Sequence, residues 1–579
     1  MKNQLALLTL CLFFSGFSLL AQPLSGDYTI GGPAPDYPTF TDAVDALISN
    51  GVDGPVLFTI ADGTYSEQIS IPEITGASSA NTITFLGNGI FTSLLFTGSF
   101  SQRAGIELNG ADHIILDNIQ IHAIDQYGWC IHLHNGADNN TIRNCILVAE
   151  GVIQNEDAAI VGSNSTTNTA VAGDVADSLV IENNHLDGGW NAIELYSSGN
   201  AYLRINGNTI NNFGRWATRI VGFNDFTYND NDLYSNTDGS VSDHLFGLTA
   251  LNCANPGRIN GNHILLNHLK RISGISLNNT SGTVDDKILI ANNAVIIIGE
   301  TNEVQVRAFA LQGTSGQVKF YHNSASINTD PSSRALIMEA NNSGGVELVN
   351  NIFANFGLGL ALDIGDPTDV VLSDHNDFFN LSGELVLWGG NTYTSLTSYQ
   401  SASGFDVHSL AVNPEFANVE SNLHAESLVM DNAGIPVPEV SDDFDGQLRH
   451  PATPDMGADE FFFDSLDVVN LQLIQPVTGM SPDGSAEVRV LLAHFQLKSV
   501  TDIPVAYTIN NGPPVFDTIG LLLPNSTVEF AFGTPADLSA EGTYQVMVYS
   551  DYWNDTDRSN DTIYQNIQSA ICRSTWAGM

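Results

Sequence analysis

Ile259-Asn260-Gly261-Asn262-His263-Ile264 is one copy of a short pattern that recurs along this chain. An alternating, strand-like run leads into an asparagine, and a short apolar segment follows it. The recurring asparagines are Asn118, Asn144, Asn184, Asn208, Asn231, Asn262, Asn293, Asn323, Asn351 and Asn376. They are separated by 26, 40, 24, 23, 31, 31, 30, 28 and 25 residues. A period of about 20–50 residues is typical of stacked supersecondary units, so the sequence predicts a solenoid.

Each repeat also contains a second strand-like run, for example residues 105–108, 192–195 and 274–277. Apolar and polar residues alternate there, which places one face inside and one outside. Steps of mostly 23 to 31 residues match one coil of a right-handed parallel β-helix, and the 40-residue step predicts a long loop within residues 163–177. A leucine-rich repeat is the alternative architecture, but its leucine spacing is absent. The recurring asparagine is expected to form an internal ladder of amide hydrogen bonds.

The predicted organisation is all-β, with a signal peptide at 1–21, an N-terminal cap at 22–104 and the β-helix at 105–463. The cap includes an amphipathic helix over 40–48, stopped by Asn50-Gly51. Residues 464–568 contain short alternating strands with turns between them, which predicts a β-sandwich. Residues 569–579 form a tail.

Three segments of the cap resemble the start of pectin-lyase-like β-helix proteins, including pectin methylesterases. They are Phe40-Thr41-Asp42-Ala43-Val44, Asp62-Gly63-Thr64-Tyr65-Ser66-Glu67 and Ile83-Thr84-Phe85-Leu86-Gly87-Asn88-Gly89. Residues 505–512 and 559–563 resemble the immunoglobulin-like, cell-adhesion-related modules that follow such solenoids in bacterial proteins. The resemblance implies a secreted or cell-surface protein.

Composition limits the choice of partners. The chain has 64 Asp and Glu against 18 Lys and Arg, a formal net charge of −46. This charge argues against nucleic acid and anionic membranes as partners. The apolar run before Ala21 reads as a secretory signal, and no membrane-spanning segment follows it. Cys130, Cys145, Cys253 and Cys572 lack zinc-type spacing and are expected to be buried thiols, with a Cys130–Cys145 disulfide as the alternative. A monomer is expected.

Catalytic signatures of β-helix enzymes are not found in the sequence. The methylesterase resemblance ends with the cap, before that family's catalytic residues. Asn236-Thr237-Asp238-Gly239 matches one polygalacturonase motif, but the required partner motifs are missing. An inverting glycosidase needs two carboxyl groups about 6.5–9.5 Å apart, and Asp238 has no assured partner. A solvent-exposed turn is the preferred interpretation of this motif.

Loops that follow the recurring asparagine contain an unusual group of side chains. Three of the six tryptophans in the chain lie there, with several cations. The predicted ligand-binding residues are Trp129, Trp190, Arg215, Trp216, Lys270 and Arg271. Stacked coils would align them along one edge, where indoles and charged groups suit a sugar ligand. Packing of the tryptophans against the solenoid is the alternative.

Two short motifs are candidate metal sites. His132 and His134 lie on the same side of one strand, but the sequence shows no third ligand, so an exposed polar face is the preferred interpretation. Asp443 and Asp445 are candidate calcium ligands, with a turn that ends the solenoid as the alternative. Calcium is the only cofactor that the sequence suggests.

Together these features predict a secreted or cell-surface β-helix protein that is not an enzyme and that binds polysaccharide or mediates adhesion. The alternative is a polysaccharide lyase or glycoside hydrolase that acts on an acidic, uronate-containing glycan. The fold hosts both classes, so the fold does not choose between them.

Overall fold

The computed structural model describes residues 22–151, 157–199, 201–237, 242–299, 305–329, 332–381, 383–461, 468–479, 485–494, 499–523, 526–553, 555 and 558–569. The chain divides into two compact units, Met1–Glu460 and Phe461–Met579. The predicted signal peptide at 1–21 and residues 570–579 of the predicted tail lie outside the described residues.

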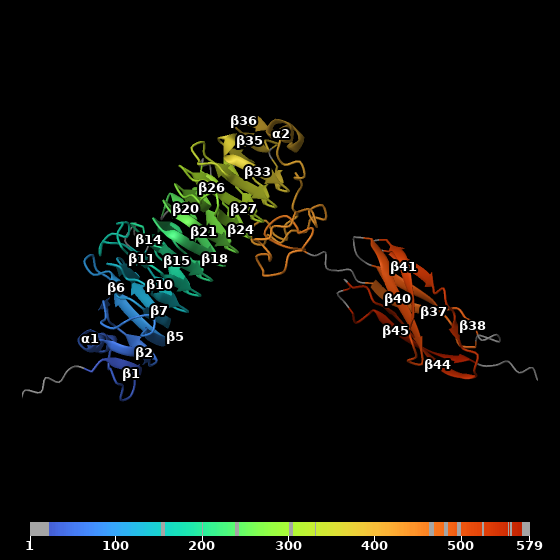
Figure 1. Cartoon of the computed structure of the whole chain (residues 1–579), viewed down its shortest axis with the longest axis horizontal. Helices are drawn as coiled ribbons and strands as arrows, with labels where there is room; N and C mark the ends of the chain where they lie inside the picture. Colours follow the sequence, from blue (N-terminus) through green and yellow to red (C-terminus); the bar gives the residue numbers. More distant parts are fainter. Residues whose placement is uncertain are drawn as a thin grey trace, which may run out of the picture. The chain divides into compact units, whose positions relative to one another are not determined.

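The first unit is a parallel β-solenoid whose coils each contribute up to three strands (Figure 1). Strands of one coil pair in parallel with those of the next, which forms three long faces. Face 1 contains β1 (Leu24–Ile30), β2 (Val52–Ile60), β9 (Thr141–Arg143), β12 (Val180–Glu182), β15 (Ala201–Asn206), β18 (Asn224–Asn229), β21 (Ala254–Asn260), β24 (Ile288–Ala291), β27 (Val318–Tyr321), β30 (Val346–Val349) and β33 (Val370–Asp374). The predicted parallel solenoid is thus confirmed.

Face 2 follows face 1 after a sharp corner. It contains β3 (Gly63–Tyr65), β10 (Ile146–Ala149), β13 (His185–Gly188), β16 (Thr209–Asn211), β19 (Asp232–Thr237), β22 (His263–His268), β25 (Ala294–Ile298), β28 (Ser324–Asn328), β31 (Ile352–Asn355) and β34 (Asp377–Asn380). The long strands β5 (Ile83–Thr97) and β7 (Ile114–Ile124) run through both faces, so the two are joined in one 23-stranded sheet.

Face 3 is a separate 13-stranded sheet. It contains β4 (Ile69–Pro72), β6 (Ala104–Asn109), β8 (Trp129–His134), β11 (Ala158–Gly162), β14 (Asn191–Tyr196), β17 (Trp216–Val221), β20 (His244–Leu251), β23 (Arg271–Asn278), β26 (Val306–Gln312), β29 (Ser333–Met338), β32 (Leu360–Ile364), β35 (Val386–Trp388) and β36 (Asn391–Tyr393). Only β36 pairs antiparallel within this sheet. The long loop predicted within 163–177 connects β11 to β12.

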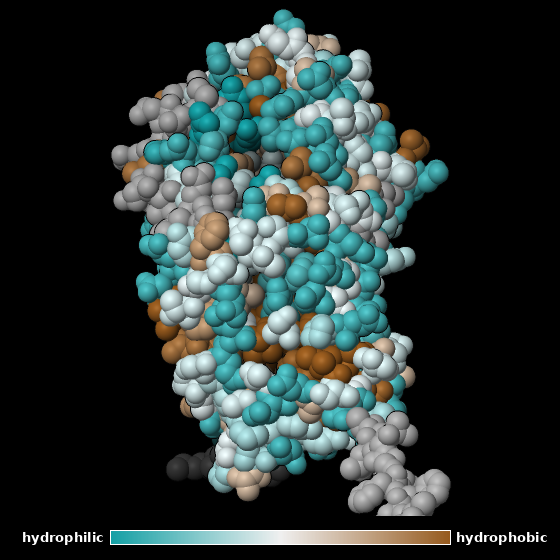
Figure 2. Space-filling model, turned by 90° about the vertical axis from the view of Figure 1, so that its left-hand side faces the viewer, coloured by the Kyte–Doolittle hydropathy of each residue, from teal (hydrophilic) through white to brown (hydrophobic). Residues whose placement is uncertain are grey.

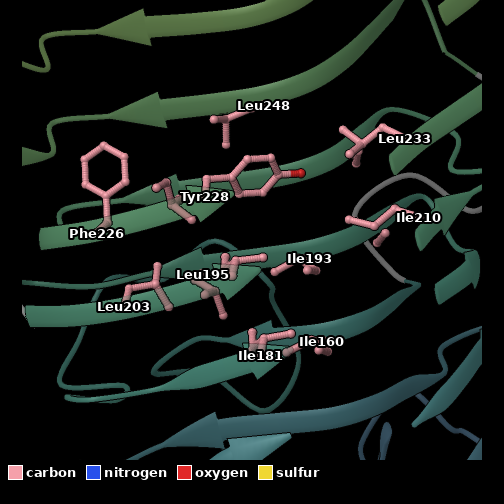
Figure 3. Packing of buried hydrophobic residues seen from close by; sticks show 14 of the residues in the cluster. Ile160, Ile181, Ile193, Leu195, Leu203, Ile210, Phe226, Tyr228, Leu233 and Leu248 are labelled. Carbon is pink, nitrogen blue, oxygen red and sulfur yellow. The ribbon is translucent and has the colours of Figure 1, made fainter. Parts of the chain in front are cut away.

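The interior of the solenoid is a continuous column of apolar side chains. Ile160 and Ile193 from face 3 meet Ile181 and Ile210 from the other two faces (Figure 3). These residues are completely buried. Removing one such aliphatic side chain from water contributes about 1.5–3 kcal/mol, so stacking coils stabilises units that would not fold alone.

An asparagine ladder crosses the corner between face 1 and face 2. The backbone N–H and the Nδ2 of Asn262 both donate to Oδ1 of Asn293, at 3.1 and 2.8 Å. Asn231 donates in the same way to Oδ1 of Asn262, at 3.0 Å for each bond. Every amide of the ladder is buried, so these bonds satisfy groups that water does not reach. The predicted internal ladder is confirmed for Asn184, Asn208, Asn231, Asn262, Asn293, Asn323, Asn351 and Asn376.

Two of the ten predicted members occupy a different position. Asn118 and Asn144 have φ angles of 57° and 53°, and they form the left-handed residue that precedes the ladder position. Cys145 stands at the ladder position instead, and its N–H donates to Oδ1 of Asn184 at 2.9 Å. The repeat interval was right, because both residues lie one position away from the ladder. Asparagine also tolerates the left-handed region, so its presence alone does not distinguish the two positions.

The predicted N-terminal helix is present as α1 (Phe40–Asn50). Thr39 begins it, because its side chain accepts the N–H of Asp42, and Gly51 ends it with a φ of 67°. Phe40 and Leu47 on its buried face join the core of the solenoid. Its role as a cap remains a prediction. Two further helices are η1 (Pro367–Asp369) and α2 (Leu396–Ser403).

The last segment of the first unit returns along the corner that holds the ladder. Arg449 is buried there, and its Nη2 donates to Oδ1 of Asn292 at 2.8 Å. Its Nη1 lies 3.3 Å from Oε2 of Glu460, which is also buried. The N–H of Gly457 donates to the carbonyl oxygen of Asn350. These contacts attach the irregular last segment of the first unit to the solenoid.

The described residues of the second unit form three antiparallel sheets. They contain β37 (Val468–Gln475), β39 (Arg489–His494) and β42 (Ser526–Ala531); β40 (Val500–Ile509), β41 (Val515–Leu522), β44 (Gly542–Ser550) and β45 (Thr562–Ser569); and β38 (Ser485–Ala486) with β43 (Ala536–Asp537). Val490, Val505 and Val548 share one buried cluster. An all-β C-terminal region is thus present, and its immunoglobulin-like character stays a prediction. Among the described residues, no helix is long and apolar enough to cross a membrane.

Three cysteines lie within the described residues. Cys130, Cys145 and Cys253 are buried and free, which confirms the predicted buried thiols at these positions. Burial raises the pKa of each thiol to about 12, so none is a thiolate at neutral pH. Cys572 lies outside the described residues.

Candidate functional site

Face 3 aligns residues of successive coils into rows, because its strands pair in register. One row faces the core and includes Ile131, Ile160 and Ile193. The neighbouring row faces outward on the pleated sheet. That outward row contains Glu107, His132, Val161, Glu194, Arg219, Thr249, Ser276, Ala310, Ile337 and Asp363. Charged side chains from distant parts of the sequence therefore share one surface.

All six predicted ligand-binding residues lie along the edge where the coils enter face 3. Trp129, Trp216 and Arg271 begin the strands β8, β17 and β23. The others stand directly before a strand, and they are Trp190, Arg215 and Lys270. The structure thus brings the six residues to one edge. Asp238 of the polygalacturonase-like motif lies outside the described residues.

The three tryptophans are not exposed. Their relative accessibilities are 0% for Trp129, 3% for Trp190 and 7% for Trp216. A pyranose ring stacks on an accessible indole face, and these rings are covered in this conformation. Their burial favours the packing role, so the ligand contacts at this edge would fall to the polar groups that surround the rings.

Arginines cover two of these indoles. The Cζ of Arg215 lies 3.9 Å from the centroid of the Trp216 ring and 5.9 Å from that of Trp190. The Cζ of Arg219 also lies near this ring, 4.5 Å from the Trp216 centroid, and its Nη1 lies 3.3 Å from Oε1 of Glu194. Burial lowers the pKa of Arg215 and raises the pKa of Glu194. Two guanidinium groups therefore stand in partly desolvated surroundings with one buried carboxyl group.

This arginine–aromatic cluster has polar atoms that lack hydrogen-bond partners among the described residues. The buried atoms are Nε of Arg215, Nε of Arg219, Nε1 of Trp190, Nε1 of Trp216 and Oδ1 of Asn191. A buried polar atom without a partner costs about 1–3 kcal/mol. Four of the five are donors, and none of them is accessible from the surface in this conformation.

Cations are concentrated on face 3 and its starting edge. Seven of the 18 Lys and Arg residues lie there, namely Arg103, Arg215, Arg219, Lys270, Arg271, Arg307 and Arg334. Figure 2 shows one side of the molecule, where hydrophilic and neutral residues are interspersed with smaller apolar patches. In a chain with a net charge of −46, this clustering makes face 3 a candidate surface for binding a carboxylate.

A second group of charged residues surrounds a cavity of about 270 Å³ on the later coils of face 3. Arg307 and Arg334 are paired neighbours in the sheet. Nε of Arg334 donates to Oδ2 of Asp363 at 2.8 Å, and Nη1 of Arg307 lies 3.5 Å from Oε1 of Glu339. Burial lowers the pKa of Arg307. Polar groups thus extend along face 3 beyond the arginine–aromatic cluster.

Lys270 and Arg271 lie between these two groups. Lys270 forms an ion pair with Asp243, and Nη1 of Arg271 donates to Nε2 of His244 at 3.1 Å. Burial and the nearby Arg271 lower the pKa of His244, which favours the neutral imidazole at pH 7. The side chain of Lys270 is 38% exposed, so it is accessible to a ligand.

His132 and His134 are buried, so the predicted exposed polar face is wrong. Their sequence showed no third ligand, but the neighbouring coil supplies Glu107, which pairs with His132 in the sheet. Hydrogen bonds with the two imidazoles hold the pKa of Glu107 well below its usual range. Glu107 and His132 line a cavity of about 160 Å³ with Arg103 and Trp129. Arg103 lies 5.3 Å from the Trp129 ring centroid.

The two candidate calcium ligands have other partners. Oδ1 of Asp443 accepts the N–H groups of Asp445 and Gln447, and its Oδ2 accepts the N–H of Glu460. Asp445 is 2.6 Å from Nε2 of His424. These bonds stabilise a turn near the end of the solenoid, the arrangement named above as the alternative to calcium. His424, Asp445 and Asp459 also form a group with metal-ligand spacing.

No protein-family model and no curated protein matches the chain. Among solved structures it is similar to PfbA, a surface adhesin of Streptococcus pneumoniae, with 13% identity over 60% of this chain and 88% of that one (TM-score 0.33). It is also similar to the enzymatically active domain of bacteriophage CBA120 tailspike protein 2, with 13% identity over 95% of this chain and 77% of that chain (TM-score 0.27). Pectin methylesterase PemA from Erwinia chrysanthemi matches with 9% identity over 65% of this chain and 94% of that chain (TM-score 0.21). The strand pairing itself defines this chain as a parallel β-solenoid protein.

Proposed function

We propose that this protein binds polysaccharide along face 3 without cleaving it and acts outside the cell or at its surface. The observation that carries the proposal is the concentration of seven cations on face 3 and its starting edge, in a chain with a net charge of −46. Sugar hydroxyl and carboxylate oxygens would accept hydrogen bonds from these cations. The sequence of residues 1–21 supports export.

An acidic polysaccharide fits this surface better than a neutral one. Arg215 and Arg219 lie on the coil of β17, and Arg271 lies two coils further on, at the start of β23. Guanidinium groups bind carboxylates through paired hydrogen bonds. Coils repeat at about 4.8 Å, so a chain molecule lying along face 3 would meet cations from several coils. Screening at physiological salt, with a Debye length of about 8 Å, limits repulsion by the distant carboxylates of the protein.

Retention on immobilised polygalacturonate, compared with an uncharged polysaccharide, tests this proposal. The double variant Lys270→Gln/Arg271→Gln should lose retention. The double variant Arg204→Gln/Arg258→Gln removes the same charge from face 1 and should keep it, since these two arginines pair with Asp225 and Asp286 away from face 3. Equal retention of both variants would overturn the placement on face 3.

A polysaccharide lyase or glycoside hydrolase is the second candidate, and one group favours it. Glu194 is a buried carboxyl whose pKa is raised, as in a general acid, and it stands beside Arg219. The same incubation with polygalacturonate therefore includes assays for unsaturated products and new reducing ends. Turnover that disappears in Glu194→Gln would replace the binding proposal with this enzyme class.

A further inference from the structure

Three possible metal ligands from two coils converge beside the smaller cavity of face 3. Glu107 lies on β6, and His132 and His134 lie on β8. Oε1 of Glu107 is 3.7 Å from Nδ1 of His132 and 3.1 Å from Nε2 of His134. All three ligand atoms lie within 4.8 Å of one another. Ligand atoms held about 2.0–2.2 Å from a tetrahedral zinc ion are roughly 3.4 Å apart, so the spacing suits such an ion.

The hydrogen bonding of His132 leaves an acceptor atom of its ring facing an acceptor atom of Glu107. Its Nε2 lies 2.9 Å from the carbonyl oxygen of Ser163, so Nε2 carries the hydrogen. In a neutral imidazole Nδ1 then carries a lone pair. This lone pair faces Oε1 of Glu107, which is also an acceptor. Two facing acceptors repel each other, and a metal ion between them would remove this repulsion.

The surroundings hold His132 in place. The bond from His132 to Ser163 fixes the orientation of its ring, as backbone carbonyls do for many metal-bound histidines. The rings of His132 and His134 stack with centroids 4.5 Å apart and planes at 9°. Trp129 contacts His132 from another side, at 5.0 Å between centroids. The lone pairs of two parallel rings do not point at one ion, so one imidazole must turn when the metal binds, and the bond to Ser163 makes His134 the ring that turns.

We infer that Glu107, His132 and His134 form a three-ligand site for a divalent transition metal ion, with zinc as the best fit. Two imidazoles and one carboxylate suit zinc, whereas calcium and magnesium prefer oxygen ligands. Glu107 and His132 line the cavity of about 160 Å³, so a fourth position would be open to a water molecule or a ligand oxygen. Arg103 lines the same cavity and would complement an anionic group at that position. This site does not depend on the proposed polysaccharide binding.

Zinc counting by equilibrium dialysis of metal-free protein tests the inference. The wild type should bind one zinc ion more than Glu107→Gln and one more than His134→Gln. The control is His122→Gln, since Nε2 of His122 lies 2.8 Å from Oε1 of Glu150 on the neighbouring coil, an exposed His–Glu pair outside the proposed site. The control should keep the wild-type count. Two other groups, around His408 and His424, have metal-ligand spacing, so the difference between proteins is decisive and the total is not.

Cobalt substitution adds a spectroscopic readout. The wild type and the control should show the visible absorption of four-coordinate cobalt, and the two site variants should lose it. Anomalous scattering from wild-type crystals grown with zinc checks the position without any substitution. Equal zinc counts in wild type and variants, or no anomalous peak between the three side chains, would overturn the inference.

Discussion

Replacing Asn262 by leucine is the sharpest test of the asparagine ladder. Leucine has a similar size but removes both amide functions from a fully buried position. The N–H and the Nδ2 of Asn231 then lose the oxygen to which both donate at 3.0 Å. The carbonyl oxygen of Tyr228 loses the donor that lies 2.8 Å away. Three polar groups are therefore left without these partners.

Each orphaned group costs about 1–3 kcal/mol, and the apolar side chain recovers about 1–2 kcal/mol by burial. We therefore expect Asn262→Leu to lower the free energy of unfolding by about 3–5 kcal/mol in urea titrations followed by far-ultraviolet circular dichroism. Hydrogen exchange at the amide of Asn231 should accelerate as well. The matched control is Asn224→Leu, an exposed asparagine on the preceding coil, which should change stability by less than about 0.5 kcal/mol.

Asn262→Asp separates the loss of the donor from the loss of the acceptor. The new carboxyl keeps an acceptor for Asn231 but turns its second oxygen toward the carbonyl of Tyr228 and Oδ1 of Asn293. Burial and these acceptors would raise the folded-state pKa above the unfolded value of about 3.9, so stability should fall as the pH rises from about 4. The ladder argument fails if Asn262→Leu costs less than about 1 kcal/mol or leaves exchange at Asn231 unchanged.

Three more predictions use the same denaturation assay. Burial raises the pKa of Asp377 to about 7, so between about pH 4 and pH 7 the folded state binds more protons than the unfolded state. The stability of the wild type should therefore fall with rising pH relative to that of Asp377→Asn. Parallel plots of stability against pH for the two proteins would contradict this prediction. Arg449→Met should lower the free energy of unfolding by about 3–5 kcal/mol because Glu460 stays buried without its cation. A decrease below about 1 kcal/mol would refute this prediction. Cys145→Asn should be tolerated within about 1 kcal/mol because Asn184 already accepts from this position, whereas a loss as large as that of Arg449→Met would speak against an extendable ladder.

Periodicity was enough to predict the solenoid, because one buried position per coil must be filled in the same way each time. The interval could not tell the ladder from the residue before it, as Asn144 and Cys145 show. Both positions favour asparagine, one for its amide and one for its tolerance of the left-handed region. Only the strand pairing in the structure distinguishes the ladder position from the left-handed position before it.

Burial and partners of the candidate site residues were harder to predict. The sequence placed Trp129, Trp190 and Trp216 on one edge, but the arginines and the long loop after β11 that accompany them are a matter of tertiary packing. Glu107 stands 25 residues before His132, close to one repeat, so a search one coil upstream of the two histidines would have found the third ligand. In a solenoid, residues that are neighbours in space are about one coil apart in sequence. The lack of a third ligand close to His132 and His134 in the sequence therefore does not exclude a metal site.

The asparagine ladder has a direction. Each coil donates to the oxygen of the following coil, so the series receives a donor from Cys145 at one end and gives one to Oγ of Ser409 at the other. Every internal member presents the same pair of connections to its neighbours. A duplicated coil could therefore be spliced into the middle, or one could be deleted, without breaking the polarity of the series. Lengthening of the gene by whole repeats would in this way be tolerated by the protein, and the length of face 3 would grow or shrink by one row with each event.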